Sequence, residues 1–277
     1  LLLTFAIGAA SHGSQRWISI GPFSLQPSEL AKIGIILFLA AYISSKSREM
    51  RQWKKMVIPF LFAIPIIVIV GIENLSTCII LLAISFIMIF VATPLLVPFV
   101  VIGLIGVAGA GGLLLTQGYR MERITVWLDP AASEKGHQTI QGLYAIGSGG
   151  LFGKGLGQSM QKLGFLPEAN NDMIFSVICE ELGLFGALCV LALFFALIWR
   201  FMVIAVNAPD LYGSMIVVGV IAHIGIQVFI NIAVATNTIP NTGIPLPFIS
   251  YGGSSLVFML LEMGLVLSVS RYINVKK

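Results

Sequence analysis

Residues 164–183 read GFLPEANNDMIFSVICEELG, and they join a polar, turn-rich segment directly to a long apolar run. The run continues as far as Trp199 and is interrupted only by Glu180 and Glu181. Asp172 lies at the junction, where an aqueous loop becomes a membrane helix. A carboxylate in that place can meet water-soluble groups and lipid-borne groups together. Asp172 is therefore the first candidate for chemistry.

The composition is that of a polytopic membrane protein. The 277 residues are 57% hydrophobic and only 10% charged, whereas a soluble domain needs far more polar surface. The net charge of +4 is attributed to membrane topology and not to a nucleic-acid partner. Cys78, Cys179 and Cys189 all lie in apolar runs. Their spacing predicts neither a disulfide framework nor a metal site.

Several apolar runs approach or exceed the ~20 residues that a spanning helix needs. They cover residues 30–44, 57–72, 76–92, 95–116, 173–199, 211–235 and 252–270. Residues 1–9 resemble the end of a further helix whose beginning is missing, which gives about eight spans. Backbone groups in lipid must be satisfied within the segment, and the runs are too continuous for barrel strands. We therefore expect an all-α transmembrane helical bundle.

Basic residues predict the orientation of the bundle. The loop 46–55 carries five Lys or Arg residues against one acid, Arg200 follows the fifth run, and three more basic residues lie near the C-terminus. Alternation of the spans puts these groups on one side, which must be the cytoplasm. The loops 117–171 and 236–251 then face outward. We expect the larger of them to contain short helices lying against the bundle, not a separate domain.

Five segments in order cover nearly the whole chain: QRWISIGPFSLQPSELAK (15–32), YRMERITVWLDP (119–130), QGLYAIGSGGLFGKGLGQSMQKLGFLPE (141–168), DMIFSVICEELG (172–183) and TGIPLPFISYGGSS (242–255). Together they resemble the SEDS family of FtsW, RodA and SpoVE, for which the last segment is close to diagnostic. NAPDLYGS (207–214) and SRY (270–272) are more similar to the FtsW/SpoVE branch. Family members have ten spans, so the resemblance implies one SEDS membrane domain over 1–277 that lacks the first two spans and most of the third, with 117–171 as its large outer loop.

The resemblance implies a peptidoglycan glycosyltransferase that polymerises lipid II, an undecaprenyl-diphosphate-linked disaccharide pentapeptide. It places the active site on the extracytoplasmic face of the bacterial cell membrane. It also implies a class B penicillin-binding protein and other divisome or elongasome membrane proteins as partners. The family's essential acid follows the LPE motif, and that position here is Asp172. IENLST (72–77) departs from the family's acidic-Pro-Asp-x-Gly-Thr signature, so no role is carried over to Glu73.

Inverting glycosyl transfer needs a base for the acceptor hydroxyl and help for the departing diphosphate. Asp172 suits the first task, and backbone donors at the start of a helix should keep it ionised. The alternative is that Asp172, or Asn171, only caps that helix. The two roles are compatible.

Further candidates for substrate binding lie on the same outer side. Glu29 and Lys32 are three residues apart and share a helix face. An exposed ion pair is the alternative, although charges near hydrocarbon usually face a bundle interior. The resemblance implies that Lys32 holds diphosphate and Glu29 orients it. The other substrate-binding candidates are Arg16, Arg120, Arg123, Lys162 and Ser254; Arg suits phosphate oxygens, and an interface anchor or a solvated charge is the alternative for the basic ones.

Two other functions stay open. A lipid II flippase would use ionisable groups inside the membrane, and Glu180, Glu181, His223 and Glu262 are of that kind. The densest polar cluster is nevertheless at the outer surface and not at the midplane, which favours the polymerase. A non-catalytic scaffold would tolerate Asp172→Asn. The sequence predicts no protein metal site, and Mg²⁺ or Mn²⁺ as an assisting cation is compatible with it.

Three spatial relations are predicted. Asp172 should share one cavity with Glu29 and Lys32. His223 and Glu262 lie near the middle of consecutive antiparallel runs, so they should be at nearly the same depth. An unpaired carboxylate there is costly, which favours a hydrogen-bonded pair; the alternative is that each faces another neighbour or a watery cavity. The two adjacent glutamates of the fifth run point about 100° apart on a helix, and one of them should pair with a neighbouring helix.

Overall fold

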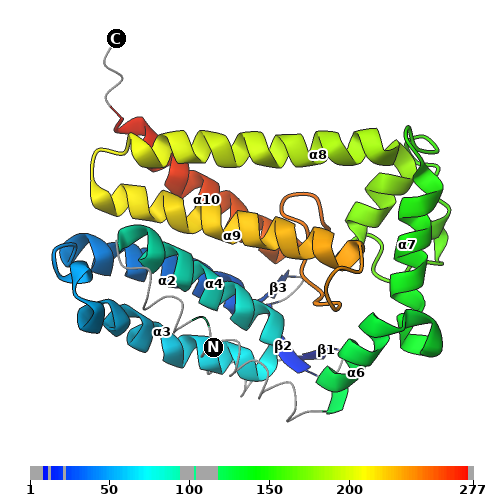
Figure 1. Cartoon of the computed structure of the whole chain (residues 1–277), viewed down its shortest axis with the longest axis horizontal. Coiled ribbons are helices and arrows are strands. Elements are labelled where there is room, and N and C mark those ends of the chain that lie inside the picture. Colours follow the sequence, from blue (N-terminus) through cyan, green and yellow to red (C-terminus); the bar gives the residue numbers. More distant parts are fainter. Residues whose placement is uncertain (1–8, 12–13, 21–22, 94–102, 104–117, 274–277) are drawn as a thin grey trace. The chain divides into compact units, whose positions relative to one another are not determined.

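The computed structural model describes residues 9–11, 14–20, 23–93, 103 and 118–273 (Figure 1). The chain divides into two compact units. Unit 1 comprises Leu1–Phe99, Leu197–Ile226 and Gly252–Lys277, and unit 2 comprises Val100–Ala196 and Gln227–Tyr251. Helices α8 (Ile174–Val206) and α9 (Leu211–Ala235) contribute residues to both units.

Six helices among the described residues are long and apolar enough to cross a membrane. They are α2 (Pro27–Ser45), α3 (Trp53–Glu73), α4 (Leu75–Ala92), α8, α9 and α10 (Gly253–Arg271). The predicted helical membrane bundle is confirmed, and α9 has the predicted bounds. The two remaining runs, at 1–9 and 95–116, lie almost wholly outside the described residues.

The core of unit 1 is built where α4 packs against α2 and α3. The fully buried side chains recur at helical spacing: Ile36, Leu39 and Ile43 on α2, and Leu81, Ile84 and Met88 on α4. Gly219 brings α9 close to this core, since an added Cβ would lie 2.6 Å from Ile36 Cγ2 and 3.0 Å from Met88 Sδ. Apolar side chains at three- and four-residue intervals explain this packing.

A small antiparallel sheet, which the sequence analysis did not predict, precedes α2. It consists of β1 (Ala9–Ser11), β2 (Ser14–Ile20) and β3 (Phe23–Leu25), in the order β1-β2-β3. Trp17 pairs with Ala9, and Ile18 pairs with Leu25. Aromatic and β-branched residues in β2 favour extended backbone. The sheet is therefore an addition to a helical fold.

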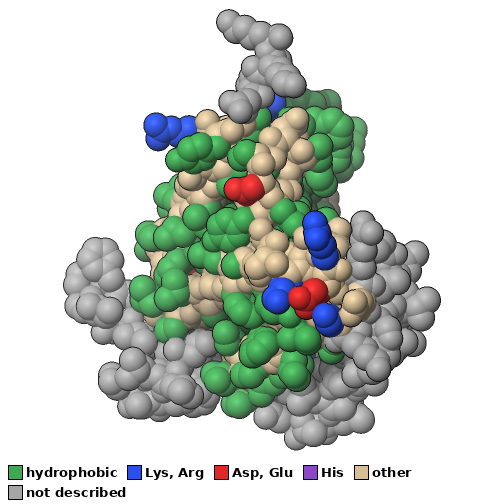
Figure 2. Space-filling model, turned by 90° about the vertical axis from the view of Figure 1, so that its left-hand side faces the viewer, with side chains coloured by type: hydrophobic (Ala, Val, Ile, Leu, Met, Phe, Trp, Pro, Cys, Tyr) green, Lys and Arg blue, Asp and Glu red, His purple; other side chains and the backbone are tan. Residues whose placement is uncertain are grey.

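Basic side chains gather at one end of unit 1. Glu49, in the 3₁₀ turn η1 (Glu49–Arg51), pairs with Lys46 at 3.1 Å and Lys55 at 3.2 Å. Figure 2 shows basic side chains around an acidic one on this face. The C-terminal ends of α8 and α10 lie at the same end (Figure 1). This agrees with the grouping used to predict orientation, while its assignment to the cytoplasm stays a prediction.

In unit 2, the large loop 117–171 forms short helices. They are α6 (Gly118–Leu128), η2 (Pro130–Ala132), η3 (Glu134–Gly136), α7 (His137–Gly149) and η4 (Gln161–Leu163). α7 packs against the start of α8, because a Cβ on Gly142 would lie 2.6 Å from Met173 Cε. Trp127 of α6 donates a hydrogen bond to the Asn237 carbonyl at 3.0 Å. The predicted short helices packed against spanning helices are confirmed.

The predicted pairing of His223 with Glu262 is also confirmed, within unit 1. His223 Nδ1 lies 2.9 Å from each Glu262 carboxylate oxygen. Both side chains are almost fully buried. The pair joins α9 to α10 where neither side chain can reach water.

We expect a double-mutant cycle of His223→Leu and Glu262→Leu to show a coupling of about 1 kcal/mol or more in the free energy of unfolding. Either single change leaves the other buried group without its hydrogen bond, which costs about 1–3 kcal/mol. Reversible unfolding in mixed micelles measures the coupling. The control is the same cycle on the exposed pair Lys55–Glu49, for which we expect no measurable coupling. Additive effects at His223 and Glu262 would contradict the interaction.

Candidate active site

Asp172 lies in the turn that leads into α8, and its side chain is only 9% exposed. The backbone N–H groups of Asn171 and Met173 donate to the Glu168 carbonyl at 3.0 and 3.3 Å. Glu168 adopts a left-handed conformation with φ 53°, and its carboxylate accepts a hydrogen bond from the Asn171 amide. Glu168 therefore shapes this turn.

The segment after α9 braces the same turn within unit 2. The Asn231 amide donates to the carbonyls of Asp172 and Ile244, at 2.8 Å each. The Ser250 hydroxyl donates to the Asn171 carbonyl at 2.6 Å. The loop 236–251 therefore packs on the turn that carries Asp172. Ser250 serves this packing.

Burial raises the pKa of Asp172 from 3.8 to about 6. Loss of solvation is the largest cause, and the Glu168 charge adds to it. The backbone N–H of Asp172, the positive charge of Arg123 and a hydrogen bond from Gln138 act in the opposite direction. The sequence predicted that backbone donors would keep Asp172 ionised; a backbone donor does lower its pKa, but burial outweighs it. A carboxylate with a pKa near 6 is mostly ionised at pH 7 and is a stronger base than an ordinary Asp.

Sequence reasoning missed the amide side chains around Asp172. Gln138 of α7 hydrogen-bonds to Asp172 and accepts a hydrogen bond from Asn241 at 2.9 Å. The Arg123 guanidinium in turn donates to the Asn241 carbonyl at 3.2 Å. An amide in an otherwise apolar membrane span indicates an internal hydrogen bond, so Asn231 could have been found. Gln138, in a polar loop, gives no such signal.

Glu29 and Lys32 form a buried ion pair on α2, with 2.9 Å between Oε1 and Nζ. Their predicted common face is confirmed, and neither side chain is solvent-exposed. Glu29 Oε2 is a buried oxygen with no hydrogen-bond partner among the described residues. The pair belongs to unit 1 and Asp172 to unit 2. The shared cavity therefore stays a prediction.

The other predicted substrate-binding residues are spread over several elements. Arg16 lies on β2 and Arg120 on α6, with side chains outside the described part of the structure. Ser254 is half-buried in the first turn of α10. Among the members whose side chains the structure describes, Arg123 is the one with an effect on Asp172. Substrate binding by these residues stays a prediction.

Glu180 and Glu181 both bind the loop that follows α7. Glu180 pairs with Lys154 at 2.6 Å, and Glu181 pairs with Lys162 at 2.5 Å. The prediction that one of them would pair with a neighbouring helix is confirmed for Glu180, which accepts a hydrogen bond from Ser148 of α7 at 3.4 Å. The loop, which wraps around the start of α8, supplies the lysine partners of both glutamates. Lys162, a predicted diphosphate ligand, is engaged in this pairing, and its role toward substrate stays a prediction.

Comparisons with a family model and with known proteins all point to the same family. The family model described as "Cell cycle protein", for FtsW, RodA and SpoVE, matches residues 1–275. Stage V sporulation protein E of Bacillus subtilis (strain 168) is 47% identical over 278 residues, which cover 98% of this chain and 75% of that protein. The probable peptidoglycan glycosyltransferase FtsW of Geobacter sp. (strain M18) is 37% identical over 276 residues, with the same coverage of 98% and 75%.

A solved structure shares the fold. A chain of a peptidoglycan synthase complex that coordinates polymerization and crosslinking superposes with a TM-score of 0.79 at 28% identity, over 99% of this chain and 79% of that one. The family match spans nearly all of the chain, and the relatives exceed 30% identity over three quarters of their own length. The chain belongs to the FtsW/RodA/SpoVE family.

Proposed function

We propose that this chain is a peptidoglycan glycosyltransferase that polymerises glycan strands from lipid II, with Asp172 as general base. FtsW relatives carry the name of that activity, and the similar solved chain belongs to a peptidoglycan synthase complex. The observation that carries the proposal is the buried Asp172 carboxylate, whose pKa is raised to about 6. A base works best when its pKa lies near the working pH.

The proposed step is an inverting displacement at the anomeric carbon of the lipid-bound growing strand. A sugar hydroxyl of the incoming lipid-linked disaccharide attacks that carbon, and its proton passes to an Asp172 carboxylate oxygen. The bond from the anomeric carbon to the diphosphate breaks, and undecaprenyl diphosphate leaves with the electron pair. Asn231 and the turn at Glu168 hold the backbone of Asp172 in place. A fixed base keeps the proton transfer within hydrogen-bond reach.

The departing diphosphate needs positive charge. Lys32 has one carboxylate partner, Glu29, in the described structure, and an ammonium group has three donors. We assign the remaining donors to the diphosphate, with Glu29 orienting Lys32. Among the described residues, no group of three or more His, Cys, Asp or Glu could hold a metal ion. We propose Mg²⁺ or Mn²⁺ as a counter-ion of the diphosphate, and no step is assigned to it.

A transporter is less well supported by the contacts of its candidate groups. Of the four intramembrane acids and bases considered for a flippase, His223 is paired with Glu262, while Glu180 and Glu181 are paired with lysines. A proton-coupled carrier needs ionisable groups that can change partners during transport. Fixed pairs fit a structural role better.

The chain is a multi-pass membrane protein, and we propose the bacterial cell membrane as its location, with Asp172 on the outer face and the C-terminus in the cytoplasm. The basic end of unit 1, which includes the C-terminal end of α10, supports this orientation. We also propose a class B penicillin-binding protein as partner, with other division or elongation proteins. The complex that contains the similar solved chain supports such a partner.

We expect Asp172→Asn to lower lipid II polymerisation at least about 100-fold, because positioned acid–base groups contribute about 10²–10⁴ to rate. Stability should not fall, since Asn fills the same space, can cap a helix and carries no buried charge. Polymerisation by the full-length protein with its transpeptidase partner measures the effect. Glu134→Gln, an exposed acid of the same loop, is the control. Parental activity of Asp172→Asn would exclude Asp172 as the base, whereas absence of polymerisation by the parent protein would favour the scaffold.

The pH dependence should follow Asp172. The pKa of this acid is raised above its ordinary value, so the proton is retained up to higher pH and the base is lost as pH falls through about 6. We expect kcat/KM to level off above that pH and to fall about tenfold per pH unit below it. By linkage, folded-state stability falls as pH rises between 3.8 and about 6. A rate that stays flat down to about pH 4 would exclude Asp172 as the base.

A further inference from the structure

Loop 150–163 is joined to α8 by main-chain hydrogen bonds at a break in the helix. α8 loses helical geometry at Gly183, with φ 68° and ψ −167°. The N–H groups of residues 154 and 155 donate to the carbonyls of Glu180 and Glu181 at 3.0 and 2.9 Å. The N–H groups of Leu184 and Phe185 donate to the carbonyls of residues 150 and 151 at 2.9 and 3.0 Å. The loop thus satisfies backbone groups that the break leaves without helical partners.

Glycine is required at this junction. The positive φ of Gly183 disfavours other residues, and a Cβ there would lie 2.4 Å from the backbone nitrogen of Gly153. Gly153, with φ 77°, would place its own Cβ 2.1 Å from the Glu181 carbonyl oxygen. The backbones of the loop and the helix are therefore in direct contact, and this contact fixes where the loop lies along α8.

The side chains of Glu180 and Glu181 also hold loop 150–163 on α8. Glu180 accepts hydrogen bonds from Lys154 Nζ, from the Ser159 hydroxyl and from two backbone N–H groups of residues 160 and 161. Glu181 accepts hydrogen bonds from Lys162 Nζ and from the N–H groups of residues 157 and 159. Each carboxylate has a lysine of the loop as its counter-charge. The loop and the start of α8 therefore form one neutral assembly.

The length of α8 sets the depth of this assembly. After the break, α8 has 23 residues, 184–206, which measure about 35 Å at ~1.5 Å per residue, slightly more than the hydrocarbon core of about 30 Å. Counted back from Val206, about 30 Å ends near residue 186. Counted back from Trp199, an aromatic side chain typical of an interface, about 30 Å ends near Glu180. Both counts put Gly183 within about 5 Å of the edge of the core.

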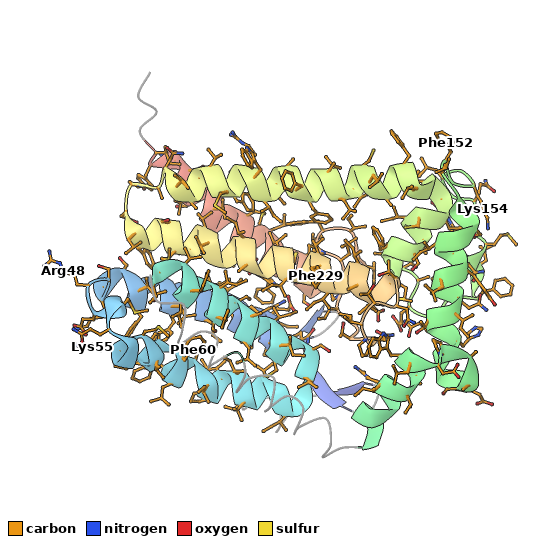
Figure 3. The ribbon with its side chains drawn as sticks, in the orientation of Figure 1. Arg48, Lys55, Phe60, Phe152, Lys154 and Phe229 are labelled. Carbon is orange, nitrogen blue, oxygen red and sulfur yellow. The ribbon has the colours of Figure 1, made fainter. Side chains whose placement is uncertain are left out.

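Loop 150–163 carries large apolar side chains that the described protein leaves uncovered. Their exposed fractions lie between 55% and 81%, for Leu151, Phe152, Leu156, Met160 and Leu163. Figure 3 shows Phe152 and Lys154 where the loop lies beside α7 and α8, with Phe152 on the outside. Directly after the break, Leu184, Phe185 and Leu188 of the spanning helix are exposed as well. The backbone bonds make these two sets one continuous apolar surface.

We propose that loop 150–163 lies in the bilayer interface at the Asp172 end of α8, with Leu151, Phe152 and Leu156 in contact with lipid acyl chains. Apolar side chains enter the headgroup–acyl boundary by about 5–10 Å in interfacial segments, which matches the depth set by α8. The lipid is favoured over a protein partner because the surface continues that of a spanning helix. The lysines of the loop, already paired with glutamates, are not needed for an acidic partner.

The loop also sets the depth of the active site. η4 (Gln161–Leu163) ends the loop, and the Leu166 N–H donates to the Gln161 carbonyl at 2.9 Å, just before the turn that holds Asp172. A loop anchored at the interface therefore keeps Asp172 near the headgroup layer, where the diphosphate of a lipid-linked substrate lies. This consequence rests on the proposed function, whereas the lipid contact does not.

Nitroxide accessibility in nanodiscs tests the proposal. Cys189 is exposed while Cys78 and Cys179 are buried, so Cys189→Ser provides the background for single labels at Phe152→Cys and Leu156→Cys. The nanodiscs contain one copy of the chain in phosphatidylethanolamine and phosphatidylglycerol. Leu193→Cys, on the exposed side of α8, is the lipid control, and Glu134→Cys, on exposed η3, is the water control. Collision rates with oxygen and with a water-soluble nickel chelate are compared.

We expect the ratio of oxygen to nickel collisions at 152 and 156 to be several-fold above that at 134 and below that at 193. Glu180→Gln with Glu181→Gln should move the ratio at 152 toward the water value, because only the main-chain hydrogen bonds then hold the loop on α8. A water-like ratio at 152 and 156, with a lipid-like ratio at 193, would overturn the proposal and assign the surface to a protein partner. A lipid-like ratio only when two copies share a disc would assign it to a second copy. No substrate is present, so failure of the glycosyltransferase proposal leaves these outcomes unchanged.

Discussion

A membrane helix that breaks must find other partners for its free backbone groups, and α8 meets this requirement with loop 150–163. The break at Gly183 exposes carbonyls at Glu180 and Glu181, and the loop supplies the donors. In hydrocarbon or at its edge, each unsatisfied group costs several kcal/mol. The loop, the end of α7 and the start of α8 are therefore obliged to fold together. The turn that carries Asp172 lies between these elements in the chain and takes its position from them.

Asp172 shows how such a frame changes the chemistry of one side chain. Helix donors and the Arg123 charge favour the ionised form, yet loss of solvation outweighs them. Burial is possible because Asn231 and Ser250 satisfy the carbonyls of the turn from the α9 side. The polar backbone is thus satisfied while the carboxylate is kept from water. Asp172 is thus a base with a raised pKa, held in a turn whose backbone hydrogen bonds are satisfied.

The sequence was most informative where composition or depth decides the outcome. The apolar run 211–235 has the bounds of α9, and the equal depth of His223 and Glu262 predicted their pairing. It was least informative where a distant segment decides. The sequence did not predict that one loop would bind both Glu180 and Glu181, because one glycine in an apolar run does not indicate a break in the helix. The burial of Asp172 depends on residues about sixty positions away in the chain, which no local pattern contains.

The spacing of these contacts along the chain implies an order of assembly. The ion pairs of Glu180 and Glu181 join residues 26 and 19 positions apart, whereas Asn231 reaches Asp172 across 59 positions and Ser250 reaches Asn171 across 79. Closing a short loop loses less chain entropy than closing a long one. The loop and the start of α8 can thus form a local nucleus while the later helices are still being made. The hydrogen bonds from Asn231 and Ser250 to the Asp172 turn form last. A chain stopped before α9 would therefore have the ion pairs of Glu180 and Glu181 but no ordered active site.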